Sequence, residues 1–215
     1  MNPKELIARR VAKEIPHRSL VNLGIGLPSL VAAYISKDTD IFFHSENGII
    51  GIIDVPKGMD NTSLSNAGGG MVGALPGAAA FDSAFSFGLI RGGHLDMTVL
   101  GGLQVDEQGL LANWNIPGKM VPGMGGAMDL VTSAKRVVVA MTHTAKGAPK
   151  VLAKLTLPKT SIRPVDLIIT ELATMQPIKG GLLLKELAPG VNLTQVLAAT
   201  EANLIISDHI KTMNI

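Results

Sequence analysis

The segment FHSENGIIG, residues 43–51, places the carboxylate of Glu46 between two apolar runs. A single glutamate is most often a solvated surface residue, and Asn47-Gly48 between apolar runs is a strong hairpin signal that would put Glu46 at the tip of a turn. The alternative depends on the fold, because a residue at the carboxyl end of a parallel strand faces a ligand site. Gly48 would then let a substrate approach closely. The local pattern leaves both interpretations open.

Other catalytic patterns in the sequence are weak or missing. Gly24-Ile25-Gly26 resembles the start of a dinucleotide fingerprint, but Ser29 stands where the third glycine belongs, so a tight structural turn is favoured. No G-x-S-x-G elbow is present, which disfavours a serine hydrolase. The five histidines are scattered and there is no cysteine, so we expect no metal site, thiolate chemistry or disulfide.

The composition describes a well-buried, weakly charged chain. Of 215 residues, 47% are apolar and 17% charged, with 24 glycines, which excludes a disordered protein. The net charge is +2, the basic residues are scattered and aromatic residues make up 3%, so nucleic-acid binding is not expected. The amphipathic N-terminus is not a signal peptide, and no run of about 18 apolar residues could span a membrane. These features predict a cytoplasmic protein that hides extra apolar surface in an oligomer.

The order of apolar runs and turn signals predicts an α/β fold. Asn2 and Pro3 start a helix, with Glu5 at the capping-box position, and a strand at 20–23, a helix at 28–35 and a strand at 41–43 follow. Further expected elements are a helix over 82–91, strands at 97–100, 137–141 and 166–170, a hairpin turning at 180–181, a short helix over 194–200 and a strand near 204–206. Residues 101–128 read as a long glycine-rich loop, which in a compact domain usually has a functional use. The prediction is one domain over residues 1–215, with a mostly parallel sheet flanked by helices and a small β-hairpin excursion.

The segment FHSENGIIG resembles the Ser-Glu-Asn-Gly signature of the B (β) subunit of family I coenzyme A transferases. VNLGIGLPSLVA, SNAGGGMVGALPGAAAFDSAFSFGLIRGGHLDMTVLGGLQVDEQG, LANWNIPGKMVPGMGGAMDLV and AKRVVVAMTH resemble the same polypeptide in the same order, up to about Pro158. Within the family, the sequence is most similar to the B (β) subunit of 3-oxoacid or acetate/acetoacetate CoA-transferases. The resemblance implies the CoA-transferase (NagB-RpiA-like) fold.

The resemblance also implies a ping-pong mechanism through Glu46. The carboxylate would attack an acyl-CoA thioester to form an acyl-glutamyl anhydride, CoA thiolate would convert this to a glutamyl-CoA thioester, and a second carboxylic acid would take the CoA. A carboxylate suits this cycle because it is ionised at neutral pH and needs no partner base. Coenzyme A is then a substrate, and no separate cofactor is expected.

The resemblance extends to further site residues. Gly125 and Gly126 match an oxyanion or CoA-binding glycine segment, while Gln104, Asn47 and Gly48 match positions in the substrate pocket. The alternatives without a functional role are that Gly125 and Gly126 are turn glycines and that Gln104 is a surface amide. His44 is interpreted as structural.

Other features leave the acid specificity and the second half of the site open. The sequence departs from the family pattern at 52–56, at Thr142, where relatives commonly carry Glu, and at 172–178. No A-subunit half is recognisable, which implies an A (α) subunit partner, in an α2β2 tetramer. The main expectation is transfer of CoA between a short-chain acyl-CoA and a 3-oxoacid or other carboxylic acid. The alternatives are a dicarboxylate or longer 3-oxo acid as substrate, or a non-catalytic ligand-binding scaffold.

Overall fold

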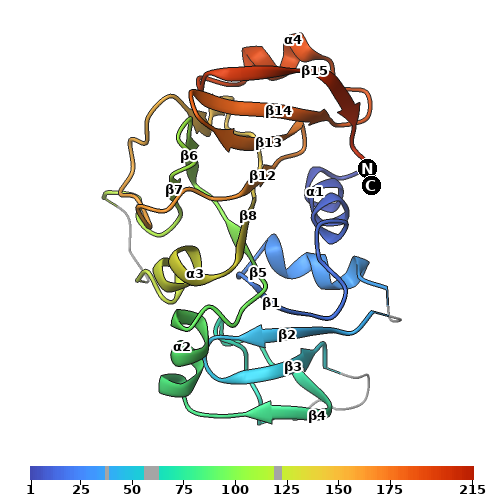
Figure 1. Ribbon diagram of the computed structural model, residues 1–215, viewed down its shortest axis with the longest axis vertical. Helices are drawn as coiled ribbons and strands as arrows, with labels where there is room; N and C mark the ends of the chain where they lie inside the picture. Colours follow the sequence, from blue (N-terminus) through green and yellow to red (C-terminus); the bar gives the residue numbers. More distant parts are fainter. Residues whose placement is uncertain (37–38, 56–62, 119–122) are drawn as a thin grey trace.

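One sheet of ten strands runs through the molecule, in the order β15-β14-β13-β12-β8-β5-β1-β2-β3-β4 (Figure 1). The computed structural model describes residues 1–36, 39–55, 63–118 and 123–215. The five strands from β12 to β2 are parallel to one another. Antiparallel pairing extends the sheet on both sides, and the outermost pair, β14 and β15, is again parallel. The predicted α/β class with a mostly parallel sheet is confirmed.

The strands fall into three groups. The central parallel strands are β1 (Ser19–Leu23), β2 (Ile41–Ser45), β5 (Met97–Gly101), β8 (Arg136–Ala140) and β12 (Leu167–Ile169). The outer strands of the large sheet are β3 (Ile49–Ile53), β4 (Gly73–Ala80), β13 (Ala173–Ile178), β14 (Gly181–Leu187) and β15 (Leu204–Thr212). A small three-stranded sheet contains β6 (Gln104–Asp106), β7 (Leu111–Ala112) and β11 (Val151–Leu152). A two-stranded sheet contains β9 (Thr144–Ala145) and β10 (Ala148–Pro149).

Helices cover both faces of the central strands, with α2 and α3 on one side and α1 on the other (Figure 1). Along β8, Val137 and Val139 pack in the core cluster that contains residues of α2 and α3, whereas Val138 packs in the cluster that contains residues of α1. Strands buried on both faces read as continuous apolar runs, which is why they were predictable. The helices are α1 (Pro3–Ala12), the 3-10 helix η1 (Pro28–Tyr34), α2 (Ser83–Arg91), α3 (Ala127–Ser133) and α4 (Leu193–Ala198).

The glycine-rich middle of the chain holds more regular structure than the sequence predicted. The expected loop over 101–128 contains β6 and β7, and α3 begins within it at Ala127. Strands of two or three residues are too short to produce a periodic pattern. The segment 73–80, where glycine and proline obscure the pattern, forms β4 against β3. Residues 119–122 of the expected loop lie outside the described residues.

Two smaller expectations have different outcomes. The hairpin near Gly180-Gly181 is confirmed, because β13 and β14 are antiparallel and Gly180 has a φ of +96°. Asn2 caps α1 by accepting from the Lys4 N–H at 3.0 Å. The capping-box role of Glu5 is wrong, since its carboxylate pairs with Arg9 one turn later.

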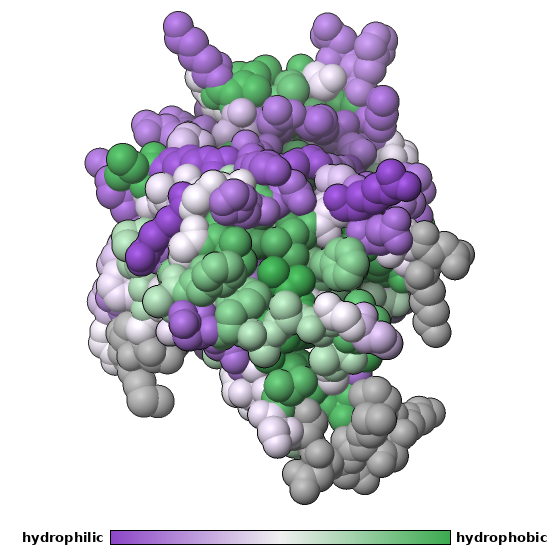
Figure 2. All heavy atoms as spheres, turned by 60° about the horizontal axis from the view of Figure 1, so that its bottom comes forward, coloured by the Kyte–Doolittle hydropathy of each residue, from purple (hydrophilic) through white to green (hydrophobic). Residues whose placement is uncertain are grey.

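Several large apolar side chains remain exposed, among them Ile25 at 73%, Met71 at 60% and Phe85 at 57%. Figure 2 shows apolar side chains gathered in the middle of the face it presents, between the grey segments. Among the described residues, no helix is both long and apolar enough to cross a membrane.

An ion cluster joins α1 to the sheet. Arg10 donates to Glu14 and to Glu186 of β14, each at 2.6 Å, and Arg136 of β8 also pairs with Glu14. Burial alone would raise the pKa of Glu14, but the hydrogen bond and charge of Arg10, together with Arg136, hold it below its ordinary value. A carboxyl whose pKa is lower in the folded than in the unfolded state stabilises the fold above its unfolded pKa.

We therefore predict that Glu14→Gln lowers the free energy of unfolding by about 1–3 kcal/mol at neutral pH, because two guanidinium groups lose their anionic partner. The loss should shrink as the pH falls below about 4, where Glu14 is progressively protonated in the folded protein too. Urea unfolding at several pH values measures both effects. The exposed Glu5→Gln variant is the control and should stay within about 0.5 kcal/mol. An equal loss at all pH values would contradict the electrostatic explanation.

Candidate active site

Glu46 lies directly after β2, in the turn that joins β2 to β3. β2 is parallel to β1, with Asn22 opposite His44, and antiparallel to β3, with Ser45 opposite Ile49. The structure therefore combines the two expected geometries, since Glu46 sits in a hairpin turn and the hairpin grows from a parallel strand. The carboxyl ends of the parallel strands meet at the edge of the sheet where α/β proteins bind ligands.

The Glu46 carboxylate is anchored from β1. Asn22 Nδ2 donates to Glu46 Oε2 at 3.0 Å, and the Glu46 side chain is only partly buried. Among the described residues, Asn22 is the hydrogen-bond partner of this carboxylate. Oε2 is thus held by the protein, whereas the described residues form no hydrogen bond to Oε1.

Asn22 belongs to a row of buried polar side chains across three neighbouring strands. The register places Thr98 of β5 and His44 of β2 on either side of Asn22, and all three are at most 1% exposed. Thr98 Oγ1 donates to Asn22 Oδ1 at 3.3 Å, and His44 Nε2 lies 2.9 Å from Ser86 Oγ of α2. Burial lowers the pKa of His44 to about 4, so the imidazole is neutral at pH 7. The row therefore adds hydrogen bonds but no charge beneath Glu46.

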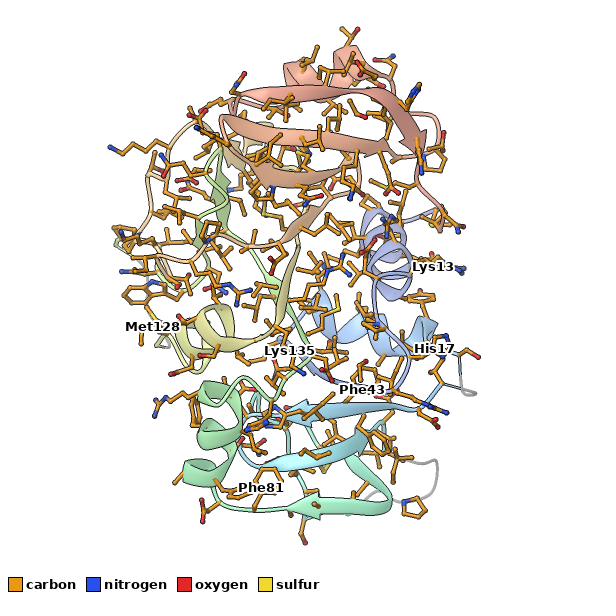
Figure 3. The ribbon with its side chains drawn as sticks, viewed as in Figure 1. Lys13, His17, Phe43, Phe81, Met128 and Lys135 are labelled. Carbon is orange, nitrogen blue, oxygen red and sulfur yellow. The ribbon has the colours of Figure 1, made fainter. Side chains whose placement is uncertain are left out.

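The turn after Glu46 is held against the chain between β4 and α2. Gly48 has a φ of +120°, and its carbonyl accepts from the Phe81 N–H at 2.9 Å (Phe81 is labelled in Figure 3). A Cβ at Gly48 would lie 2.0 Å from the Phe81 carbonyl oxygen, so only glycine fits this position. Asn47 Nδ2 donates to the Ser65 carbonyl at 2.6 Å. Asn47 and Gly48 thus fix the course of the turn.

Glu46 borders two cavities. The first, of about 700 Å³, extends between Phe43, Ile52 and Val72, and the second, of about 610 Å³, extends between Leu100, Trp114 and Gly126. The residues common to both linings are Gly24, Ile25, Glu46, Ala67 and Gly68. The carboxylate lies where the two spaces meet, so groups in either one can reach it.

The glycine segment before α3 lies beside Glu46. Gly125 and Gly126 both line the second cavity, and a Cβ on Gly126 would come within 3.3 Å of Glu46 Cγ. Gln104 lies elsewhere: its amide donates to Thr156 Oγ1 at 2.7 Å and accepts from the Thr156 and Leu157 N–H groups at 3.0 Å. It lines neither cavity, so the structure brings the two glycines, but not Gln104, to Glu46.

Sequence reasoning overlooked Asn22 and Thr98. The available signal was a polar residue inside the apolar run Leu20-Val21-Asn22-Leu23, where a buried strand should be apolar. Within the described part of the chain, no cluster of three or more His, Cys, Asp or Glu side chains is arranged to hold a metal ion.

We predict that Gly48→Ala lowers turnover about 10²-fold or more, because the clash with Phe81 must displace the turn and a shift of about 1 Å at a reacting group costs that much. Steady-state kinetics of the folded variant, assembled with its A subunit, measure the loss. Gly147→Ala is the matched control, since Gly147 also has a positive φ, of +81°, but nothing lies within 4 Å of the added Cβ. It should lose about 1–2 kcal/mol of stability and keep its turnover. Equal turnover in both variants would show that the turn does not position Glu46.

The chain is similar to coenzyme A transferases over its whole length. The family model for Coenzyme A transferase matches residues 4–199. The β subunit of the acetate CoA-transferase of Haemophilus influenzae is 53% identical over 100% of this chain and 97% of that protein, and the protein of the same description from Escherichia coli K12 is 52% identical. The B subunit of a succinyl-CoA:3-ketoacid coenzyme A transferase of Helicobacter pylori is 48% identical over 93% of this chain and 97% of that protein.

Solved structures show the same architecture. An acyl-CoA transferase from Escherichia coli O157:H7 superposes with a TM-score of 0.79 at 26% identity, and this chain covers 43% of that longer chain. The decarboxylase AibA/AibB, with a TM-score of 0.74 at 18% identity, shares the fold alone, so the fold by itself does not select one reaction. The family assignment rests on the sequence relatives and the matched model, and this chain belongs to the coenzyme A transferase family.

Proposed function

We propose that this chain is the B subunit of a CoA-transferase that moves CoA between a short-chain acyl-CoA and a 3-oxoacid or other carboxylic acid, with Glu46 as the nucleophile. The observation that carries the proposal is the position of Glu46 at the junction of two cavities, with Oε2 held by Asn22. A carboxylate held in this way can attack a thioester placed in either space.

The geometry fits a ping-pong cycle. Glu46 Oε1 attacks the thioester carbonyl and expels CoA thiolate, leaving an acyl-glutamyl anhydride. The thiolate then attacks Glu46 Cδ and releases the acid, leaving a glutamyl-CoA thioester that an acceptor acid discharges by the reverse steps. Gly126 packs closely against Glu46 Cγ, where a Cβ would come within 3.3 Å, and the family resemblance implies that this glycine lies next to the reacting carbonyl. Apolar walls such as Phe43 and Leu100 exclude the water that would hydrolyse these intermediates.

The cavity linings favour a substrate acid without a second negative charge. Among the described residues that line the two cavities there is no lysine or arginine, and the charged side chains are Glu46 and Asp54. A dicarboxylate bound against these walls would leave its second carboxylate without a cation. For the half of the site that this chain supplies, the lining supports an uncharged acyl chain over the alternative of a dicarboxylate substrate.

A second polypeptide is part of the proposal. The relatives of similar length are named as β or B subunits. By contrast, this chain covers only 41% of a mouse mitochondrial succinyl-CoA:3-ketoacid coenzyme A transferase that is 46% identical. We infer that a separate A subunit supplies the other half, in an α2β2 complex in the cytoplasm. The exposed apolar side chains in Figure 2 are suited to such a contact.

The nucleophile is tested by covalent trapping. Incubation of the assembled protein with acyl-CoA and no acceptor acid should leave CoA on the peptide that contains Glu46, where borohydride or hydroxylamine traps it for mass spectrometry. Glu46→Gln removes the anionic nucleophile, and Glu46→Asp withdraws the carboxylate by one methylene, which costs about 10²-fold. Both variants should fold and lose most activity, the first more than the second. A label on another residue, or normal turnover of Glu46→Gln, would refute the assignment.

Assembly provides a separate prediction. The purified chain alone should turn over no acyl-CoA, and co-expression with an A subunit should restore transfer, because relatives of this length are named as β or B subunits and the chain covers only 41% of a longer relative. Size-exclusion chromatography with light scattering gives the stoichiometry, and a coupled assay gives the activity. Full transfer by the isolated chain would rule out a shared site.

A further inference from the structure

We propose that Asn22 is the oxyanion donor for the steps in which the carbonyl carbon of Glu46 itself is attacked. The inference rests on the proposed function, since it requires that Glu46 carries the acyl group and then CoA. It assigns a chemical role to a side chain that belongs to β1 and lies beneath the turn. It also distinguishes the oxyanion that forms on Glu46 from the oxyanion that forms on the acyl group of the substrate.

The hydrogen bonds of Asn22 leave one orientation for its amide. Nδ2 lies 3.3 Å from the His44 carbonyl oxygen, which can only accept a hydrogen bond, so the NH₂ group must point to this side. The second N–H of the same group reaches Glu46 Oε2 at 3.0 Å. Oδ1 accepts from Thr98 Oγ1. Both donors and the carbonyl are engaged, and the donor toward Oε2 is held in place before any reaction.

Burying the Asn22 amide on an apolar sheet face costs desolvation free energy, which suggests that the amide has a function there. Asn22 and Thr98 are fully buried on a sheet face that elsewhere carries apolar side chains such as Leu20 and Leu100. Burying polar groups is unfavourable unless each one is hydrogen-bonded, and even then the net gain is small. Within the described residues, the charged group that the row reaches is Glu46. A fixed donor there matches the requirement that oxyanion donors be oriented in advance.

The chemistry puts the negative charge on the oxygen that Asn22 contacts. In the anhydride, Glu46 Oε1 is bonded to the acyl group and Oε2 is the carbonyl oxygen. When the CoA thiolate attacks Cδ, a C–S bond forms and the carbonyl electron pair moves to Oε2. The Cδ–Oε1 bond then breaks, and Oε1 leaves with the acid product. When an acceptor carboxylate later attacks the thioester, a new C–O bond forms, Oε2 again carries the charge, and CoA leaves as thiolate.

Attack on the substrate carbonyl is a different event. There the charge develops on an oxygen of the acyl group, which lies in a cavity and outside the reach of an amide bonded to Oε2. Loss of the Asn22 donor should therefore slow attack at Cδ. A purely structural role for Asn22 would instead lower stability or affect all steps together.

The experiment isolates attack at Cδ. The complex of this chain with its A subunit is charged with acyl-CoA to form the Glu46-CoA thioester, freed of small molecules and mixed with hydroxylamine. The hydroxylamine nitrogen attacks Cδ and expels CoA thiolate, leaving a hydroxamate on Glu46, without any step at a substrate carbonyl. The rate of CoA release is compared between the unchanged protein and Asn22→Leu, which should be about 10²- to 10³-fold slower, the usual effect of losing one oxyanion donor.

Two further variants keep the result interpretable. Asn22→Asp preserves the shape of the side chain but has no NH₂ donor, so it should also release CoA slowly and decides the question if Asn22→Leu does not fold. Ser86→Ala removes a buried polar contact to His44 in the same region without touching Glu46, and should release CoA within about threefold of the normal rate. Normal release from folded, charged Asn22 variants would overturn the role of Asn22 and leave Glu46 as the nucleophile. Absence of a thioester in the unchanged protein would overturn the proposed function, and this inference with it.

Discussion

The site depends on the way β2 is paired on its two edges. On one edge β2 runs parallel to β1, which puts its carboxyl end at the ligand-binding edge of the sheet, and on the other edge it turns back into β3. The parallel pairing sets Asn22 beside His44, from where its amide reaches the carboxylate two residues further on. The antiparallel pairing closes a turn tight enough to require Gly48. A shift of either register by one residue would turn the carboxylate to the opposite face of the sheet.

The same pairing shows how much of the fold the sequence could predict. The central strands are short, continuous apolar runs, which local patterns detect well, and the Asn47-Gly48 hairpin and the α2 stop at Gly92 carry their own turn chemistry. The strands missed were those whose residues have no local preference. β4 is rich in glycine and alanine and exists because β3 offers it a partner. β6 and β7 are too short to be distinguished from a loop.

The residues of the candidate site likewise fall into those that a sequence motif indicated and those that only the fold brings together. A sequence motif singled out Glu46 as the candidate nucleophile, and the same resemblance singled out Gly125 and Gly126, which the structure places beside it. The support for Glu46 comes from Asn22 and Thr98, on strands that are distant in the sequence and that no motif connects. A polar residue in an apolar strand indicates that its side chain has a buried hydrogen-bond partner. Only the strand register shows that the partner of Asn22 is Glu46. Gln104 illustrates the reverse case, a polar residue whose amide fastens the segment at Thr156 and Leu157.

Charge completes the physical description of the site. The polar row beneath Glu46 is neutral, because burial keeps the His44 imidazole uncharged, and the described cavity walls supply no lysine or arginine. In the proposed cycle each anionic nucleophile attacks a neutral carbonyl, and the described cavity walls of this chain offer oriented dipoles, but no lysine or arginine, to the charge that develops. Fixed dipoles stabilise a charge that moves between atoms without trapping it on any one of them, as a full cation next to the carboxylate would. Under the proposed function Glu46 must return unchanged after each cycle, and the neutral row at Asn22 is suited to that requirement.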